Sequence, residues 1–262
     1  MTKRIVQRIH QEREHQTGHR VLFDFGLDGD DERIPALLLR PESEAQVPGV
    51  LLLHGYSSHK EQMANTVGQV LLRHGIATLA IDLPLHGERA AAGNGVNQQA
   101  TRNPLQLAST WKLAQREIAL SLEYLAAHSG VDRARIGLIG YSMGSFLGVQ
   151  AAATSRHVKA LVLASGGDLP TGTPFERIIR MVADPLRAVR KFDGKPLLMV
   201  HGRNDRTVTA EQAQRLFDAA LEPKELRWWN AGHYLPEAAI DDAATWLERQ
   251  FARAALADAS TS

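Results

Sequence analysis

The residues best suited to chemistry in this chain are a serine, an aspartate and a histidine that lie far apart in the sequence. Ser142 is the centre of residues 140–144 (GYSMG), which match the pattern G-x-S-x-G. A serine hydroxyl is a poor nucleophile until a base removes its proton, and that base in turn needs an acid to orient it. Ser142 could therefore carry out acyl transfer if the fold brings a histidine and a carboxylate to it.

The surroundings of Ser142 favour a nucleophile elbow. The motif directly follows a predicted strand at 135–139 and directly precedes a predicted helix of small residues at 145–154, which is the strand–turn–helix context that an elbow requires. Glycines at 140 and 144 remove the side chains that would clash in a strained turn. Such a turn lifts the hydroxyl above the sheet, at a helix N-terminus where developing negative charge is favoured.

The base and the acid are expected downstream, at the carboxyl ends of strands, where α/β sites are built. His233 follows a predicted strand at 226–229, and Asp205 follows one at 197–200. The resulting chain order of Ser142, Asp205 and His233 is the order expected for such a site. The alternatives are His157 and His201 for the base, and Asp184 and Asp193 for the acid. Both of these aspartates precede their strand and would lie at its wrong end.

Acyl transfer also needs hydrogen-bond donors for a tetrahedral oxyanion. We expect one donor to be the backbone N–H of Met143, the residue after the serine. The second is expected from the loop that follows the apolar residues 51–53, where Gly55 would allow a close backbone approach. We assign it to the N–H of Tyr56 and expect His54 to brace this loop.

The elements that must position these residues follow from the hydrophobic pattern. Continuous apolar runs of this length are typical of strands buried on both faces; they lie at 50–53, 77–81, 136–139, 160–164 and 196–200. Segments with helical periodicity lie at 62–73, 107–125, 210–220 and 241–251. The alternation predicts an α/β fold: a doubly wound, mostly parallel sheet with helices on both faces.

Three segments depart from this alternation. Residues 20–25 and 34–39, separated by the turn sequence Asp28-Gly29-Asp30-Asp31, predict an antiparallel hairpin at the sheet edge. Residues 85–105 have no clear period. Residues 165–194 are rich in glycine and proline, and we interpret them as a short cap-like insert with a helix at 174–182. The expected organisation is one domain over residues 1–262.

Composition excludes several classes of protein. The 262 residues are 44% hydrophobic and 23% charged, which rules out a disordered chain. The net charge of +1 provides no global attraction for nucleic acid or an anionic membrane. There is no cysteine, so neither disulfides nor thiolate sites are available. With no membrane-length apolar run and no signal peptide, we expect a cytoplasmic protein without nucleic-acid or membrane partners. The oligomeric state stays open.

Together, the elbow, the His54-Gly55-Tyr56 loop, Asp205 and His233 resemble the α/β-hydrolase superfamily over about residues 20–251. Residues 82–89 (DLPLHGER) resemble the Asp-x-Pro-x-His-Gly segment of small bacterial serine esterases related to dienelactone hydrolases. Dienelactone hydrolases proper use a cysteine nucleophile, so the resemblance implies the serine esterase branch. It also implies a structural role for Asp82 and His86, which would pin the loop beside the site.

These observations predict a serine carboxylesterase that cleaves short-chain esters through an acyl-enzyme, with no cofactor and no metal. Thioesterase, amidase or peptidase activity on the same residues is the alternative, and a non-catalytic binding protein is a more remote one. The substrate is expected to be a small-molecule ester. The residues expected to line its pocket are Tyr56, Leu85, Trp111, Met143, Phe175, Met181 and Tyr234.

Overall fold

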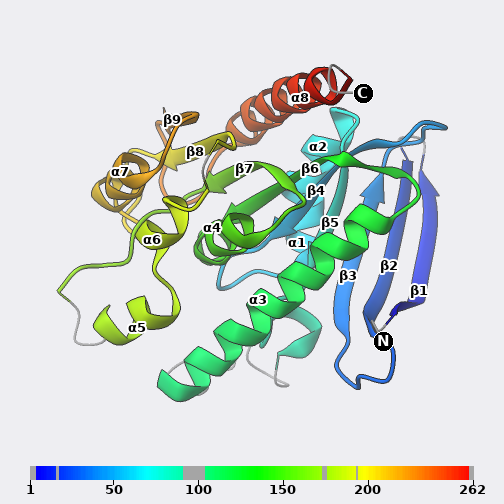
Figure 1. The fold of residues 1–262 in the computed structure, drawn as a ribbon, viewed down its shortest axis with the longest axis horizontal. Coiled ribbons are helices and arrows are strands. Elements are labelled where there is room, and N and C mark those ends of the chain that lie inside the picture. The colour runs from blue at the N-terminus through cyan, green and yellow to red at the C-terminus, as the bar shows by residue number, and fades with distance from the viewer. Residues whose placement is uncertain (1–3, 16–17, 91–103, 173–175, 193, 260–262) are drawn as a thin grey trace.

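The computed structural model describes residues 4–15, 18–90, 104–172, 176–192 and 194–259 (Figure 1). Its strands are β1 (Ile5–His15), β2 (Gly18–Leu27), β3 (Ile34–Arg40), β4 (Val47–Leu53), β5 (Ala77–Ile81), β6 (Val131–Tyr141), β7 (Val158–Ala164), β8 (Leu197–Gly202) and β9 (Lys224–Trp229). The five predicted apolar runs lie in β4 to β8, apart from Pro196, which precedes β8. The segments at 91–103 and 173–175, and the single residue 193, lie outside the described residues.

Within these residues the strands form one nine-stranded sheet in the order β1-β2-β3-β5-β4-β6-β7-β8-β9. The pairs β1–β2, β2–β3 and β3–β5 are antiparallel, whereas β4 to β9 are parallel to one another. The predicted antiparallel hairpin is confirmed, with Phe23 opposite Ala36. Its predicted place at the sheet edge is wrong, because β1 pairs with β2 and forms the edge. The doubly wound, mostly parallel α/β fold is therefore confirmed, and the charge-rich N-terminus forms the edge strand β1.

Helices cover both faces of the sheet (Figure 1). They are α1 (Lys60–Met63), α2 (Gln69–Arg73), α3 (Pro104–Ala127), α4 (Met143–Thr154), α5 (Glu176–Val182), α6 (Pro185–Val189), α7 (Ala210–Ala219) and α8 (Glu237–Ala259). A π-helical turn, Ala64–Gly68, joins α1 to α2, and a 3-10 turn spans Gly87–Arg89. Side chains of α3, α4, α6 and α7 pack in one hydrophobic core, and those of α1, α2 and α8 pack in the other.

The central strand β4 shows why its apolar run is continuous. Leu51 and Leu53 pack toward α3 and α4, whereas Val50 and Leu52 pack toward α2 and α8. All four side chains are fully buried. Burying each one contributes about 1.5–3 kcal/mol, so both faces of the strand hold the sheet between its helical layers. Within the described residues, no helix has the length and hydropathy that a membrane span requires.

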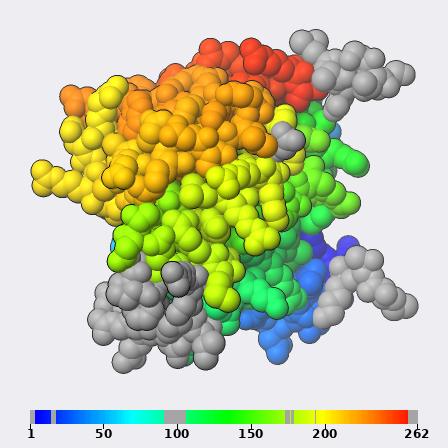
Figure 2. Space-filling model, turned by 60° about the vertical axis from the view of Figure 1, so that its left-hand side comes forward, coloured from blue at the N-terminus to red at the C-terminus, as the bar shows by residue number. Residues whose placement is uncertain are grey.

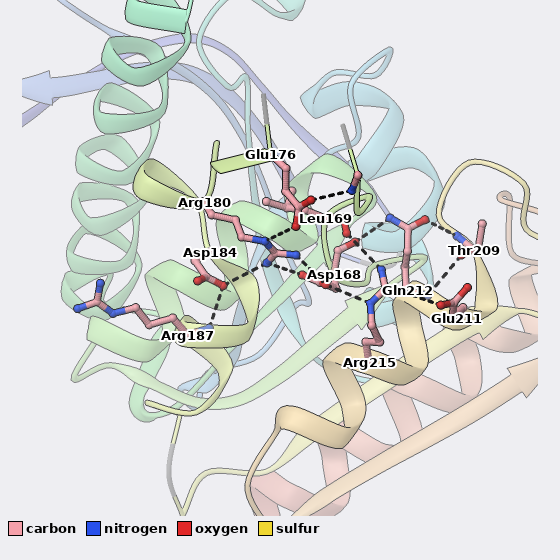
Figure 3. A network of polar contacts seen from close by, with 11 residues as sticks. Asp168, Leu169, Glu176, Arg180, Asp184, Arg187, Thr209, Glu211, Gln212 and Arg215 are labelled. Carbon is pink, nitrogen blue, oxygen red and sulfur yellow. Dashed lines mark hydrogen bonds and ion pairs between the residues drawn. The ribbon is translucent and has the colours of Figure 1, made fainter. Parts of the chain in front are cut away.

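The segment at 165–194 carries α5 and α6 and is fastened to α7 by a buried carboxylate (Figure 3). Asp168 accepts hydrogen bonds at 2.9 Å from both terminal nitrogens of Arg180, and Arg215 of α7 lies 3.2 Å from it. The Gln212 side chain donates to the Asp168 carbonyl, and the Asp168 N–H donates to the Gln212 carbonyl. Figure 2 shows the yellow-green surface of this segment against the orange surface of α7 and the loops beside it.

Candidate active site

The predicted elbow at Ser142 is a strained turn between β6 and α4. Ser142 has φ 51° and ψ −115°, in a region that residues with a side chain rarely adopt. A Cβ at Gly140 would lie 2.3 Å from the Gly144 carbonyl oxygen, and a Cβ at Gly144 would lie 2.2 Å from that of Leu53. Only glycine fits either position. Tight packing on both sides therefore holds the serine in its strained conformation.

The structure brings Ser142, His233 and Asp205 together in one chain of hydrogen bonds. The His233 Nε2 atom lies 2.9 Å from Ser142 Oγ, and Nδ1 lies 2.8 Å from Asp205 Oδ2. The other carboxylate oxygen of Asp205 accepts hydrogen bonds from the backbone N–H groups of Thr207 at 2.8 Å and Val208 at 3.0 Å. These two amides fix the carboxylate, so one of its oxygens is left to face the imidazole.

This geometry also determines the tautomer of His233. Because ionised Asp205 can only accept, the proton of the neutral imidazole lies on Nδ1. Nε2 is then free to accept the proton of the Ser142 hydroxyl. A nucleophile within reach of a base, and a base oriented by a third group, is the arrangement that activates a serine for acyl transfer.

The described alternative bases and acids have partners other than Ser142. His201 is fully buried, and burial lowers its pKa. Its Nε2 atom bonds to the Val208 carbonyl at 2.9 Å. His157 pairs with Glu123 at 3.1 Å. Asp184 caps α6, and Asp193 lies outside the described residues. None of the described alternatives is bonded to Ser142.

The loop after β4 lies directly against the nucleophile. His54 donates from Nδ1 to the Gly55 carbonyl at 2.7 Å and accepts at Nε2 from the Leu83 N–H at 3.1 Å. Burial lowers the pKa of His54 to about 4, which keeps the ring neutral in this donor–acceptor role. The Gly55 carbonyl and the Tyr56 N–H belong to one trans peptide and point in opposite directions. The hydrogen bond from His54 to that carbonyl therefore orients the Tyr56 N–H away from the His54 ring.

The other predicted donor, Met143, is the first residue of α4. The first N–H groups of a helix have no partner within the helix, and Met143 adjoins the nucleophile. Assignment of the Met143 and Tyr56 amides to an oxyanion hole stays a prediction.

The segment after β5 braces the same loop. The buried carboxylate of Asp82 accepts from the Lys60 N–H at 2.8 Å, from Lys60 Nζ at 2.9 Å and from the Glu88 N–H at 3.0 Å. His86 donates to the Pro84 carbonyl at 2.8 Å, and its ring packs against that of His54. The contacts agree with a structural role for Asp82 and His86. Sequence reasoning missed Lys60, because a lysine that begins a helix is usually exposed.

Ser142 and His233 line a cavity of about 520 Å³ between the loop after β4, the helical segment at 60–73 and the loop before α8. Its apolar lining includes Met63, Val67, Val70, Leu235 and Ile240. Its polar lining includes Gln62, Asn65, Thr66, Gln69 and Arg73. Sequence reasoning missed this wall, although the three- and four-residue steps between those polar residues are a signal that they share one helix face.

Two residues of the predicted pocket, Tyr56 and Tyr234, line this cavity. Trp111 bonds instead to Gln150 at 2.6 Å, between α3 and α4, and Met181 projects to solvent with 86% of its surface exposed. The remaining predicted residues of the pocket are Leu85 and Met143, which are not among those lining this cavity, and Phe175, which lies outside the described residues.

Comparisons with known proteins agree with this architecture. A model of the dienelactone hydrolase family matches residues 34–234. The Bacillus subtilis (strain 168) protein named "Putative esterase YitV" is 24% identical over an alignment of 236 positions that covers 77% of this chain and 89% of that protein. The Escherichia coli (strain K12) "Uncharacterized protein YcjY" is 29% identical over 116 residues, covering 44% of this chain and 34% of that protein.

Solved structures share the fold at low sequence identity. Acetyl xylan esterase 1 from Thermoanaerobacterium sp. JW/SL YS485 has a TM-score of 0.75 at 17% identity, over 95% of this chain and 89% of that one. A cold-adapted esterase from an Arctic intertidal metagenomic library has a TM-score of 0.70 at 21% identity, over 95% and 99%. At these identities the likeness shows the fold.

Proposed function

The chain belongs to the dienelactone hydrolase family, and we propose that it acts there as a serine carboxylesterase on short-chain esters. The observation that carries the proposal is the chain of hydrogen bonds from Ser142 Oγ through His233 to Asp205. The names of the B. subtilis relative and of the two solved structures support an ester substrate.

In the first half of the proposed reaction, Ser142 Oγ attacks the ester carbonyl carbon while its proton passes to His233 Nε2. Asp205 stabilises the imidazolium that forms. The Tyr56 and Met143 N–H groups donate to the oxyanion of the tetrahedral intermediate. His233 then gives its proton to the leaving alkoxide, the C–O bond breaks, and the alcohol departs from an acyl group bonded to Ser142.

The second half regenerates the enzyme. Water takes the place of the alcohol, and His233 removes its proton as the water oxygen attacks the acyl carbon. The bond to Ser142 breaks, the proton returns to the serine oxygen, and the carboxylic acid leaves. Every proton removed is returned, so the cycle needs no cofactor.

The size and the lining of the cavity support a small substrate with a polar part. Its apolar wall suits a short acyl chain, and its polar residues suit an oxygen-rich alcohol group. Thioesters or amides would use the same three residues, because the leaving group is selected by pocket shape.

The test combines covalent labelling with turnover. Wild type, Ser142→Ala and Ser121→Ala are incubated with a fluorophosphonate probe and then with p-nitrophenyl acetate, butyrate and decanoate. Ser121 serves as a control, because it is a hydrogen-bonded serine away from the site: it is buried and donates to the backbone carbonyl of Glu117. We expect stoichiometric labelling and fast turnover of the short esters in the wild type and the control, and neither in Ser142→Ala. Undiminished turnover by Ser142→Ala would overturn the proposal.

A further inference from the structure

The main-chain carbonyl of His233 is held by two side-chain hydroxyls. Tyr141 Oη donates to it at 3.0 Å, and Ser165 Oγ donates to it at 2.7 Å. Tyr141 Oη also accepts the N–H of Leu235 at 2.8 Å. The tyrosine thus bonds to the loop on both sides of Tyr234, and two hydroxyls converge on a single oxygen.

These contacts join the ends of three strands. Tyr141 is the last residue of β6 and directly precedes the nucleophile, Ser165 directly follows β7, and His233 lies in the loop after β9. The loop between β9 and α8 has no regular secondary structure, so ladder hydrogen bonds do not hold it. Its place above Ser142 must come from specific contacts such as these.

The backbone conformation of Ser165 holds its hydroxyl in the direction of the His233 carbonyl. Ser165 is fully buried and has φ 49°, a left-handed conformation that is uncommon for a residue with a Cβ. Its N–H bonds to the Val200 carbonyl at 2.9 Å, which fixes the residue to β8. Such strain persists where the surroundings over-determine it and is concentrated at functional sites.

Tyr141 is held as a neutral donor. Burial raises the pKa of its phenol above the ordinary value, so the hydroxyl keeps its proton at neutral pH. Its ring meets the His233 ring edge-on, with the centroids 6.3 Å apart. Removing the hydroxyl alone would leave this ring contact in place.

We propose that Tyr141 and Ser165 are positioning residues that together fix the main chain of His233, so that its imidazole stays between Ser142 Oγ and Asp205. The inference rests on the proposed function. Asp205 bonds to one ring nitrogen but does not fix the Cα from which the ring projects. A displacement of about 1 Å at a reacting group can cost about 100-fold in rate, so a base on an irregular loop needs such an anchor.

The test uses Tyr141→Phe, Ser165→Ala and the double variant, each of which deletes only hydroxyl groups. With p-nitrophenyl butyrate we expect each single variant to lower kcat about tenfold, with KM within about twofold, because the loss lies in alignment rather than in binding. The double variant should lose more than the product of the two, since either hydroxyl alone still holds the carbonyl. The rate of fluorophosphonate labelling should fall in parallel.

Two control variants separate positioning from a general loss of packing. Tyr124→Phe removes a hydroxyl that donates to Gln7, away from the site. Ser121→Ala removes a buried hydroxyl that donates to the Glu117 carbonyl at 2.7 Å, the same distance as in the Ser165 bond. We expect both controls to keep wild-type kcat. Equal losses in the controls, or kcat within about twofold of wild type in the double variant, would overturn the proposal.

A readout without turnover keeps this inference distinct from the proposed function. The proton on His233 Nδ1, shared with Asp205, is followed by low-field NMR of protein labelled with ¹⁵N-histidine and assigned by its loss in His233→Ala. We expect a resolved signal in the wild type and a broadened or shifted one in the double variant. An unchanged signal would contradict the positioning role. A wild type that keeps the signal but neither reacts with the probe nor hydrolyses esters would overturn the proposed function instead.

Discussion

Gly55 lies so close to Ser142 that a Cβ at position 55 would be 3.3 Å from the serine Cβ and 3.9 Å from its hydroxyl oxygen. The loop after β4 therefore meets the elbow so closely that a Cβ at position 55 would be nearer to the serine than ordinary van der Waals contact allows. The same Gly55 carbonyl accepts from His54, and the same peptide carries the Tyr56 N–H. This contact sets the distance between the nucleophile and a predicted oxyanion donor.

Substitution of Gly55 tests this spacing. Gly55→Ala should lower kcat/KM about 10- to 100-fold, because the new methyl group pushes the loop away from Ser142. The melting temperature should change little, since Gly55 is not among the residues with positive φ. Gly29→Ala is a control in which stability should change and activity should not. Gly29 has φ 79° and open space around it, so alanine should cost about 1 kcal/mol of stability through its backbone conformation alone. Wild-type kcat/KM in Gly55→Ala would contradict the expectation.

Replacing Asp205 by asparagine should change the tautomer of His233. The two backbone N–H groups at Thr207 and Val208 keep the side-chain oxygen on their side, so the NH₂ group faces His233 Nδ1. The imidazole must then place its proton on Nε2 and can no longer accept from Ser142. We expect kcat to fall about 10³- to 10⁴-fold with the fold retained. Steady-state kinetics and circular dichroism check both parts, and a loss below tenfold would contradict the role of the acid.

Stability should decline on mild acidification because of His54. Its pKa is lowered from 6.5 to about 4 by burial, so below pH 6.5 the unfolded chain binds a proton that the folded chain does not. The contribution to stability is complete above pH 6.5 and is lost as the pH falls to about 4, amounting to about 3 kcal/mol.

Urea unfolding of wild type and His54→Asn at several pH values between 7 and 4 measures this difference. The variant should show a shallower decline in unfolding free energy. An NMR titration of the wild type, in which His54 stays neutral at pH 5, provides a check that does not depend on the variant. The expectation would be contradicted if unfolding free energy fell equally steeply with pH in the two proteins and His54 became protonated near pH 6.5.

Asp168 should stabilise the segment at 165–194 far more than its exposed neighbours do. Asp168→Ala leaves Arg180 and Arg215 side by side without their buried carboxylate, at a cost of about 2–3 kcal/mol. Glu211→Ala removes a largely exposed partner of Arg215 and should cost less than about 1 kcal/mol. Urea unfolding gives both values, and limited proteolysis should cut near α5 only in Asp168→Ala. Equal effects of the two substitutions would contradict this role.

The buried strands could be predicted because their side chains face helices on both sides. All residues of the run at 50–53 are apolar for that reason, and the carboxyl ends of two such strands, β6 and β8, then locate Ser142 and Asp205. His233 follows the partly buried edge strand β9. The strained turn at Ser142 could be predicted from the glycines at 140 and 144 alone, because the steric reason for them is local to the motif.

Features that depend on distant partners could not be predicted. Lys60 is buried only because Asp82 and Glu88 approach it from the segment after β5. The π-helical turn at 64–68 interrupts a segment whose periodicity predicted one regular helix. The cavity opens beside that segment, so Trp111 of α3 and Met181 of α5, which were expected in the pocket, lie away from it. A polar helix face indicates exposure but does not show whether it faces bulk solvent or a cleft.

The segment at 165–194 is held at two points, which limits how its sequence can be exchanged by protein engineering. One end is fastened through Asp168 to α7, and at the other end Lys195 donates to the Ser155 carbonyl at 2.9 Å. Residues between these points could be exchanged without altering the strands of the sheet, provided that the replacement keeps the buried side chains of α6, Ala188 and Val189, in the core. A replacement would have to supply a guanidinium group in place of Arg180, because Asp168 stays buried whatever sequence is grafted between the two anchors.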